Sequence, residues 1–296
     1  MLARPGLPSF EYVRASTSGE VIRLLQRHGE AARLLMGGTD LFPGMRDGAF
    51  CPQVVIDVKH LPGMHDVVYD DKAGLRIGAA VTMNQLAAHP AVQAKYPLLA
   101  EAANAVASYQ IRNRATLGGN VCNASPCADT SLAAAVLEAQ MILFGPSGRR
   151  VVVAADFFLG PGQTALQEGE FLMTIHFPPS PAGAVGRHLK LSRNRLGDLA
   201  IVSVEVLGFP DGTATSGYRF RIGLGSVAPV VLRAGEAEAV LAANPPGEET
   251  FALAAEKAQQ AASPIDDVRG GAAYRSAMVR NLTLRGLWDV WARLGA

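Results

Sequence analysis

Residues 112–129 read RNRATLGGNVCNASPCAD, and this stretch says most about the fold of the 296-residue chain. Its paired glycines, Gly118 and Gly119, leave the backbone N–H groups unshielded by side chains, which suits a phosphate held against the main chain. A hydroxyl group at Thr116 precedes the pair, and a carboxylate follows at Asp129. The stretch therefore predicts a turn that binds a phosphate group.

Residues 34–41, LLMGGTDL, repeat the pattern upstream, with an apolar segment, Gly-Gly, a hydroxyl and a carboxylate. Each glycine pair is expected to follow a strand-like segment, and two such turns can close on one diphosphate from both sides. One Gly-Gly pair alone favours an ordinary tight turn. Neither stretch matches a P-loop or the GxGxxG fingerprint of the Rossmann fold. The recurrence therefore favours a dinucleotide site outside these two folds.

Composition excludes several classes of function. Apolar residues make up 49% of the chain and charged residues 18%, so a large core is expected and disorder is not. A formal net charge of +1 gives no support for binding to nucleic acid or to an acidic membrane. No apolar run approaches the length of a bilayer span, and the first residues lack the apolar core of a signal peptide. A cytoplasmic protein is expected.

Cysteine and histidine usage points away from a metal centre. The three cysteines are too few for a disulfide framework or for the four thiolates of an iron–sulfur cluster. Packing roles are therefore favoured over redox or metal roles for Cys51, Cys122 and Cys127. The six histidines show no metal-binding spacing, and His176 is interpreted as a packing or edge residue of a sheet. No catalytic base and no metal ligand is predicted.

The order of predicted elements indicates an α+β protein of three modules. A segment rich in proline and small residues, 177–183, predicts a domain boundary. Strands are expected at 32–36, 54–58, 75–81, 141–144, 151–153, 200–207 and 218–224, the last two paired. Helices are expected at 18–30, 83–88, 96–107, 130–139, 248–262 and 272–294.

The two glycine stretches resemble the flavin loops of the FAD-binding medium subunit of the molybdenum hydroxylases, the family of xanthine dehydrogenase and carbon monoxide dehydrogenase. The likeness covers nearly the whole chain and extends to 110–113, 190–202 and 269–275. It implies a two-subdomain FAD-binding domain of the vanillyl-alcohol-oxidase (PCMH) type over 1–177, with subdomains of about 1–60 and 61–177. A C-terminal α+β domain of the carbon monoxide dehydrogenase flavoprotein type is implied over 178–296.

The resemblance also implies which residues bind FAD. Backbone groups of 36–40 and 116–120 would hold the pyrophosphate, and Thr39 and Thr116 would add hydroxyl donors. Ser125 and Asp129 would lie near the ribityl or adenosine part. The full implied set is Leu35, Met36, Gly37, Gly38, Thr39, Asp40, Leu41, Thr116, Leu117, Gly118, Gly119, Asn120, Ser125, Asp129, Leu172 and Lys190.

Three of these residues have plain structural alternatives. Asp129 would serve equally as the N-cap of the helix at 130–139. Leu172 would pack near the flavin ring or be an ordinary buried strand residue. Lys190 would place a cation near the electron-rich end of the ring system or be a solvated surface lysine. Residues 193–198 resemble a loop that in some relatives covers the flavin and affects access of the nicotinamide.

The implied function is that of an FAD-containing electron-transfer subunit. A molybdenum cofactor is expected on a large partner and two [2Fe-2S] clusters on a small one, with trimers pairing into an (αβγ)2 assembly. The acceptor would be NAD, a quinone, ferredoxin or oxygen. Some relatives insert a cysteine-rich loop that holds a [4Fe-4S] cluster between the positions of Asn120 and Asp129, and no insert is present here. The alternatives are a stand-alone flavin reductase or oxidase and a non-enzymatic assembly module.

Overall fold

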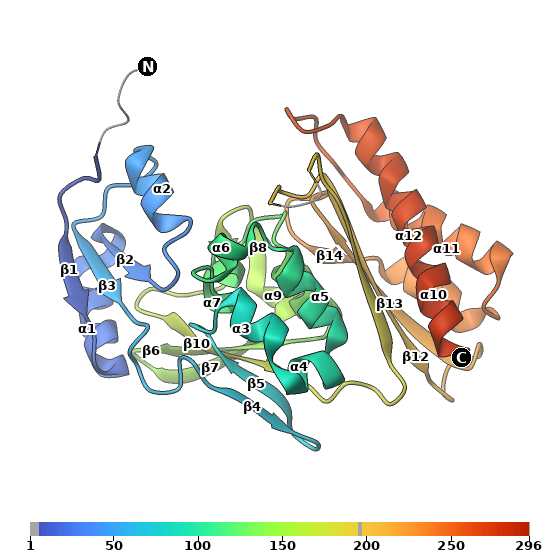
Figure 1. Cartoon of the computed structure of the whole chain (residues 1–296), viewed down its shortest axis with the longest axis horizontal. Coiled ribbons are helices and arrows are strands. Elements are labelled where there is room, and N and C mark those ends of the chain that lie inside the picture. Colours follow the sequence, from blue (N-terminus) through green and yellow to red (C-terminus); the bar gives the residue numbers. More distant parts are fainter. Residues whose placement is uncertain (1–5, 195–196, 296) are drawn as a thin grey trace.

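The computed structural model describes residues 6–194 and 197–295. Figure 1 shows three units side by side, with the N-terminal unit at the left, a central unit, and a C-terminal unit at the right. Each unit contains its own β-sheet and helices. The α+β class expected from the sequence is therefore confirmed.

The N-terminal unit is built on a three-stranded parallel sheet in the order β1-β3-β2. Every residue of the central strand β3 is buried. Helix α1 begins where the Thr17 side chain accepts the Glu20 backbone N–H, a typical N-cap. Strand β1 was missed in the sequence. The elements are β1 (Glu11–Arg14), α1 (Ser18–His28), the 3-10 turn η1 (Gly29–Ala31), β2 (Ala32–Leu35), α2 (Leu41–Arg46) and β3 (Val54–Asp57).

The central unit contains a five-stranded antiparallel sheet in the order β4-β5-β10-β6-β7. Its strands are β4 (Val67–Asp70), β5 (Gly74–Gly78), β6 (Gln140–Gly145), β7 (Gly148–Val153) and β10 (Phe171–Phe177), and a small hairpin adds β8 (Phe158–Gly160) and β9 (Gln163–Thr164). Its helices are α3 (Met83–Ala88), α4 (Pro90–Lys95), α5 (Pro97–Ala105), α6 (Tyr109–Arg112), α7 (Leu117–Cys122), α8 (Asp129–Val136) and α9 (Ala154–Phe157). His176 is a half-buried residue of the middle strand β10, so the packing interpretation is confirmed and the edge interpretation is wrong.

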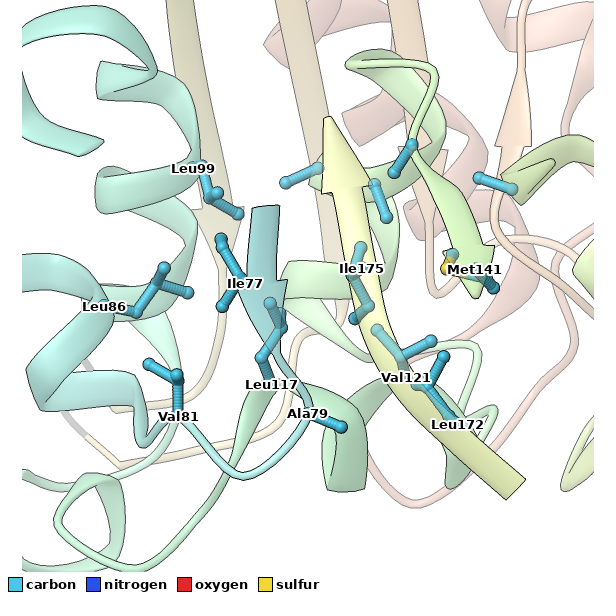
Figure 2. Close-up of a cluster of buried hydrophobic side chains, with 14 of the residues drawn as sticks. Ile77, Ala79, Val81, Leu86, Leu99, Leu117, Val121, Met141, Leu172 and Ile175 are labelled. Atoms are coloured by element: carbon cyan, nitrogen blue, oxygen red, sulfur yellow. The ribbon is translucent and has the colours of Figure 1, made fainter. Parts of the chain in front are cut away.

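Figure 2 shows how the central core forms between this sheet and its helices. Ile77 of β5 and Ile175 of β10 face Leu117 of α7, and Leu86 and Leu99 close the cluster from α3 and α5. The same buried cluster continues into the N-terminal unit. These two units therefore share one apolar core.

The C-terminal unit is a four-stranded antiparallel sheet in the order β11-β12-β13-β14 with three helices. The predicted pairing of the strands at 200–207 and 218–224 is confirmed, and the helix at 272–294 has the expected bounds. The elements are β11 (Val185–Leu191), β12 (Val202–Pro210), β13 (Tyr218–Gly225), β14 (Leu232–Arg233), α10 (Gly235–Ala243), α11 (Glu248–Ala261) and α12 (Ala272–Leu294).

The two faces of this last sheet belong to different cores. Because side chains alternate along a strand, Val204 and Val206 of β12 join the core under α12, while Leu207 joins the core of the central unit. Gly223 of β13 lies directly against Leu132 of α8. The sheet is thus covered by α12 on one face and by the central unit on the other.

Candidate functional site

The two glycine loops predicted to work together are in contact. A Cβ atom on Gly37 would lie 2.3 Å from the Arg114 carbonyl oxygen, so only a glycine allows this approach. The Thr116 hydroxyl lies 3.9 Å from the Met36 sulfur, which joins the loops a second time. Segments almost eighty residues apart in sequence therefore form one wall.

The first loop, 36–40, has the properties that a phosphate site needs. Gly38 adopts a φ of +76°, a conformation that other residues rarely adopt. Within the described chain, the backbone N–H groups of Gly37, Gly38 and Thr39 donate to no protein acceptor, and these residues are half-buried. The Thr39 hydroxyl donates only weakly to Asp40, at 3.4 Å. Successive free N–H groups of this kind form an anion-binding concavity.

The second loop differs from the expectation. The glycine pair follows helix α6 rather than a strand, and it lies inside helix α7. The Thr116 side chain caps that helix by accepting the Gly119 N–H at 3.1 Å, and the Gly118 N–H donates to Ala79 at 2.9 Å. The prediction of exposed backbone donors here is therefore wrong, because capping and the contact with Ala79 use them.

The glycines of the second loop still have a clear structural purpose. A Cβ atom on Gly118 would lie 2.6 Å from the Ala79 side chain, so glycine lets α7 approach the end of β5. Gly119 and Asn120 are half-buried, whereas Thr116 and Leu117 are buried. Asn120 accepts a hydrogen bond from Thr130 at 2.6 Å through its side-chain oxygen, which leaves its amide N–H groups as the donors on this side of the wall.

Asp129 is the first residue of α8 and does not cap it. The N-cap residue is Ala128, and it makes no side-chain capping bond. The Asp129 carboxylate instead accepts a hydrogen bond from the Lys190 ammonium at 2.7 Å. The capping alternative is therefore wrong. Nearby, the half-buried Ser125 hydroxyl accepts the Cys127 N–H at 3.3 Å.

Lys190 is not a solvated surface lysine. Its side chain is 12% exposed, and its ammonium also donates to the Ala105 carbonyl oxygen at 2.9 Å. It lines a cavity of about 330 Å³ between the end of α5 and the end of β11. The lining residues are Asn104, Ala105, Ala107, Lys190, Leu191, Ser192, Gly197 and Asp198.

Leu172 occupies a different environment from the other predicted residues. Its side chain is 1% exposed and lies in the central core beside Val121 (Figure 2). Strand β10 is irregular at this point, with a register shift between Leu172 and Thr174. Any contact of Leu172 with a cofactor would therefore involve its backbone, and its role in binding FAD stays a prediction.

Two functional candidates were missed in the sequence, His188 of β11 and Glu205 of β12. They are register partners, 3% and 0% exposed at their side chains, and His188 Nδ1 lies 2.8 Å from a Glu205 carboxylate oxygen. His188 Nε2 lies 3.4 Å from Asp129 Oδ1. Burial alone would lower the pKa of His188, but hydrogen bonds and charges of the two carboxylates raise it to about 9. A glutamate inside the apolar run of 200–209 was the available signal.

The segment of 122–128 is tied to the C-terminal unit. The Pro126 carbonyl oxygen accepts the Ser226 N–H at 2.8 Å, and the Cys127 sulfur accepts from Arg269 at 3.3 Å. Burial raises the pKa of Cys122 to about 12, so its thiol is protonated. Among the described residues, no group of three His, Cys, Asp or Glu side chains is placed to hold a metal ion.

The loop of 193–198 is only partly described. Arg193 forms an ion pair with Asp198 at 3.2 Å. Residues 195 and 196, which belong to the predicted flavin-covering loop, lie outside the described residues.

Comparison with known proteins identifies the family. Residues 8–180 match the family described as the FAD binding domain in molybdopterin dehydrogenase. Residues 187–290 match the family described as the CO dehydrogenase flavoprotein C-terminal domain. The chain belongs to the FAD-binding medium subunits of the molybdenum hydroxylases. Its function is therefore that of a flavoprotein electron-transfer subunit of an oxidoreductase complex.

Individual relatives are similar to this FAD subunit along nearly its whole length. It is 36% identical to the carbon monoxide dehydrogenase medium chain of Hydrogenophaga pseudoflava, over 97% of this chain and 98% of that one. It is 30% identical to a putative xanthine dehydrogenase FAD-binding subunit of Escherichia coli, over 96% and 97% of the two chains. A solved carbon monoxide dehydrogenase from Hydrogenophaga pseudoflava superposes with a TM-score of 0.92, covering 97% of this chain and 99% of that one at 37% identity.

The family match fixes the cofactor class and agrees with the donor set. FAD is the cofactor of this subunit. One similar solved structure is described as a Cu,Mo-containing carbon monoxide dehydrogenase, 31% identical with a TM-score of 0.91. The free N–H groups of the first loop fit a pyrophosphate, and Lys190 with Asp129 fits a polar cofactor beyond it. None of the described helices combines the length and the apolar character needed to cross a bilayer.

Proposed function

We propose that FAD lies along the wall formed by the two glycine loops, with its pyrophosphate at 36–40. The observation that carries this placement is the row of unpaired N–H groups from Gly37 to Thr39, closed on its other side by the second loop. From the second loop, we propose that the Asn120 side-chain amide donates to FAD and that Gly119 allows a close approach, because the backbone N–H groups of 117–120 are already hydrogen-bonded within the protein.

Ser125 and Asp129 would then accept hydrogen bonds from FAD hydroxyl groups. The Asn120–Thr130 hydrogen bond of 2.6 Å places α8 next to the second loop. The Asn120 amide and the Asp129 carboxylate would therefore contact the same cofactor. Lys190 lies beside them through its 2.7 Å contact with Asp129. A cation at this end favours extra negative charge on the flavin ring system, which is how a protein tunes such a cofactor.

When bound, FAD collects electrons delivered by an iron–sulfur partner and passes them to an external acceptor. The residues of this chain bind it, orient it and set its electrostatic surroundings. We propose NAD, a quinone, ferredoxin or oxygen as the acceptor, and two [2Fe-2S] clusters and a molybdenum cofactor on separate small and large partners. We further propose an (αβγ)2 assembly, which agrees with full-length similarity to medium chains of such complexes.

Two expectations on organisation stay predictions. We propose a boundary at 177/178 between an FAD-binding domain, with subdomains of about 1–60 and 61–177, and a C-terminal domain. The end of β10 at Phe177 supports it, since the next strand, β11, begins at Val185 in a different sheet. We also propose a cytoplasmic location.

The FAD content of the purified complex tests this placement. The wild-type complex is expected to contain about one FAD per medium chain, detected by its visible absorption and by fluorescence after release. Gly38→Ala is expected to lose it, since φ is +76° and the new Cβ would lie 2.8 Å from the Phe42 ring. Gly212→Ala is the matched control, because nothing lies within 4 Å of a Cβ there.

A wild-type complex that contains no flavin and takes up none from excess FAD would contradict the proposal. Equal FAD content in the Gly38→Ala and Gly212→Ala variants would contradict the placement at the first loop. Thermal unfolding of both variants shows whether any loss of FAD comes from loss of the fold.

A further inference from the structure

Four ionisable side chains form a row at the interface between the C-terminal sheet and the central unit. Glu205 contacts His188 at 2.8 Å, His188 contacts Asp129 at 3.4 Å, and Asp129 contacts Lys190 at 2.7 Å. The signs alternate when all four are charged. The row begins in the buried interface at Glu205 and ends at the cavity that Lys190 lines.

The geometry requires a proton between His188 and Asp129. His188 Nε2 and Asp129 Oδ1 face one another, and each is buried without another hydrogen-bond partner in the described chain. A neutral ring with its N–H at Nδ1 toward Glu205 would direct a lone pair of Nε2 at a carboxylate oxygen, which is unfavourable in a buried site. Burial raises the pKa of Glu205 to about 7, so above that pH its carboxylate is ionised and accepts the Nδ1–H of His188. With the second proton on Nε2, His188 is an imidazolium, in agreement with its raised pKa.

The other described elements packed against His188 bring no charge closer to its imidazole ring than Asp129 and Glu205. From α5, the Glu101 carboxylate accepts the backbone N–H of His188 at 2.9 Å and favours the same charge state. Arg187, the preceding residue, pairs with Glu101 and with Asp289 of α12. Leu189, which follows, lies against Gly286 of α12. The charges nearest to the imidazole are therefore those of Asp129 and Glu205.

We propose that His188 and Glu205 are positioning residues that hold the Asp129–Lys190 pair in place at the FAD site. The inference rests on the function proposed above. Neither residue lies in the glycine loops. Glu205 orients the ring and balances its charge, the ring fixes one oxygen of Asp129, and the other oxygen fixes the ammonium of Lys190.

A consequence for cofactor binding follows from the protonation state. Loss of the proton from His188 leaves Asp129 Oδ1 facing a lone pair, so the carboxylate is no longer held and the ammonium loses its fixed position. FAD affinity is therefore expected to fall as the pH rises through the pKa of His188, about 9. A purely structural role for His188 predicts no such step.

The test measures the rate of FAD release from the purified complex between pH 7 and 10, by the fluorescence of free FAD. The wild type is expected to show a step near pH 9. In His188→Gln, release at pH 7 is expected to be faster by about tenfold, the effect of losing one hydrogen bond to a charged group, with no step near pH 9. In Glu205→Gln the step is expected at lower pH, because removing a carboxylate lowers the pKa of His188.

His176→Gln is the matched control. His176 is a half-buried strand residue of the central sheet whose Nε2 lies 2.6 Å from the Ala73 carbonyl oxygen, and it is expected to show the wild-type profile. A wild-type step that persists in His188→Gln, or an unmoved step in Glu205→Gln, would overturn the inference. If His188→Gln fails to fold, the shift in Glu205→Gln decides. A wild-type complex without FAD at any pH instead refutes the proposed function itself.

Discussion

The Ser226 backbone N–H donates to the Pro126 carbonyl oxygen at 2.8 Å and thereby joins the C-terminal unit to the segment that follows the second glycine loop. Ser226 adopts a φ of +66°, so the chain bends sharply just after β13 to make this contact. Lys190 and His188 reach the same stretch at Asp129. The C-terminal unit therefore reaches the proposed FAD site from outside the FAD-binding family region.

Substitution at Gly223 is expected to weaken the contact between the C-terminal sheet and α8. In Gly223→Ala the new Cβ would lie 2.5 Å from Val136 and 2.8 Å from Leu132. Overpacking of this kind costs about 2 kcal/mol, so the thermal midpoint should fall by several degrees. Gly212→Ala, in open space, should change it little. Equal midpoints for the two variants would show that the interface accommodates the methyl group.

Removal of the Lys190 charge is expected to cost more than removal of an exposed one. Lys190→Gln leaves the buried Asp129 carboxylate with only its longer contact to His188, and a loss of about 2 kcal/mol in the free energy of unfolding is expected. Lys95→Gln serves as control, since Lys95 is 50% exposed and lies 3.6 Å from an exposed Asp71. That change should stay within about 0.5 kcal/mol.

The double variant Lys190→Gln/Asp129→Asn refines this test. Because the double variant also removes the charge of the Asp129 carboxylate, its loss in the free energy of unfolding should be smaller than the sum of the losses in the two single variants. Chemical denaturation of the four proteins gives the coupling energy. A coupling of zero would mean that Lys190 and Asp129 contribute to stability independently of one another.

Stability is expected to fall as the pH rises from about 6.5 to 9. The pKa of His188 is raised in the folded protein to about 9, so the native state binds more protons than the unfolded state in that interval. Its stabilising contribution is complete below the unfolded pKa, about 6.5, and is lost as the pH passes the folded pKa. Thermal midpoints of FAD-free protein at pH 6.5, 8 and 9.5 measure it. His188→Gln should flatten the profile, and an unchanged slope in that variant would assign the effect to other groups.

Arg275→Lys is expected to destabilise the C-terminal unit. The Arg275 side chain is buried, and its guanidinium donates to the carbonyl oxygens of Ile201 at 3.2 Å, Ser226 at 3.0 Å and Gly270 at 3.2 Å and pairs with Asp267. A single ammonium cannot span these acceptors, so a loss of about 2 kcal/mol in the free energy of unfolding is expected. Calorimetry should show a much smaller effect for Arg280→Lys, whose long contact with Glu256 is exposed.

Local patterns in the sequence predicted about half of the elements of the fold, and β10 and β11 are among those not predicted. Helices α1, α3 and α12 lie where the sequence predicted helices, and a capping box at Thr82 opens α3. Strand β1 escaped because it is short and mostly exposed, so no apolar alternation marks it.

The site was less predictable because its contacts are between distant segments. Two glycine pairs look alike in sequence, but only the first leaves its N–H groups free, since Ala79 and the Thr116 cap occupy those of the second. Lys190, the partner of Asp129, lies 61 residues away on strand β11 of the C-terminal sheet. Glu205 was visible as a charge in an apolar run, but its partner His188 follows only from the pairing of β11 with β12.

The two-sided burial of β12 has a consequence for how the protein unfolds. Its alternate residues complete two different cores, so separating the C-terminal unit would expose Leu207 and Phe209 together with the His188–Glu205 pair, which would lose its contact with Asp129. Both the C-terminal unit and the rest of the chain would then expose apolar side chains to water. The subunit should melt in a single cooperative transition, and an isolated fragment of 178–296 should self-associate instead of behaving as an independent domain.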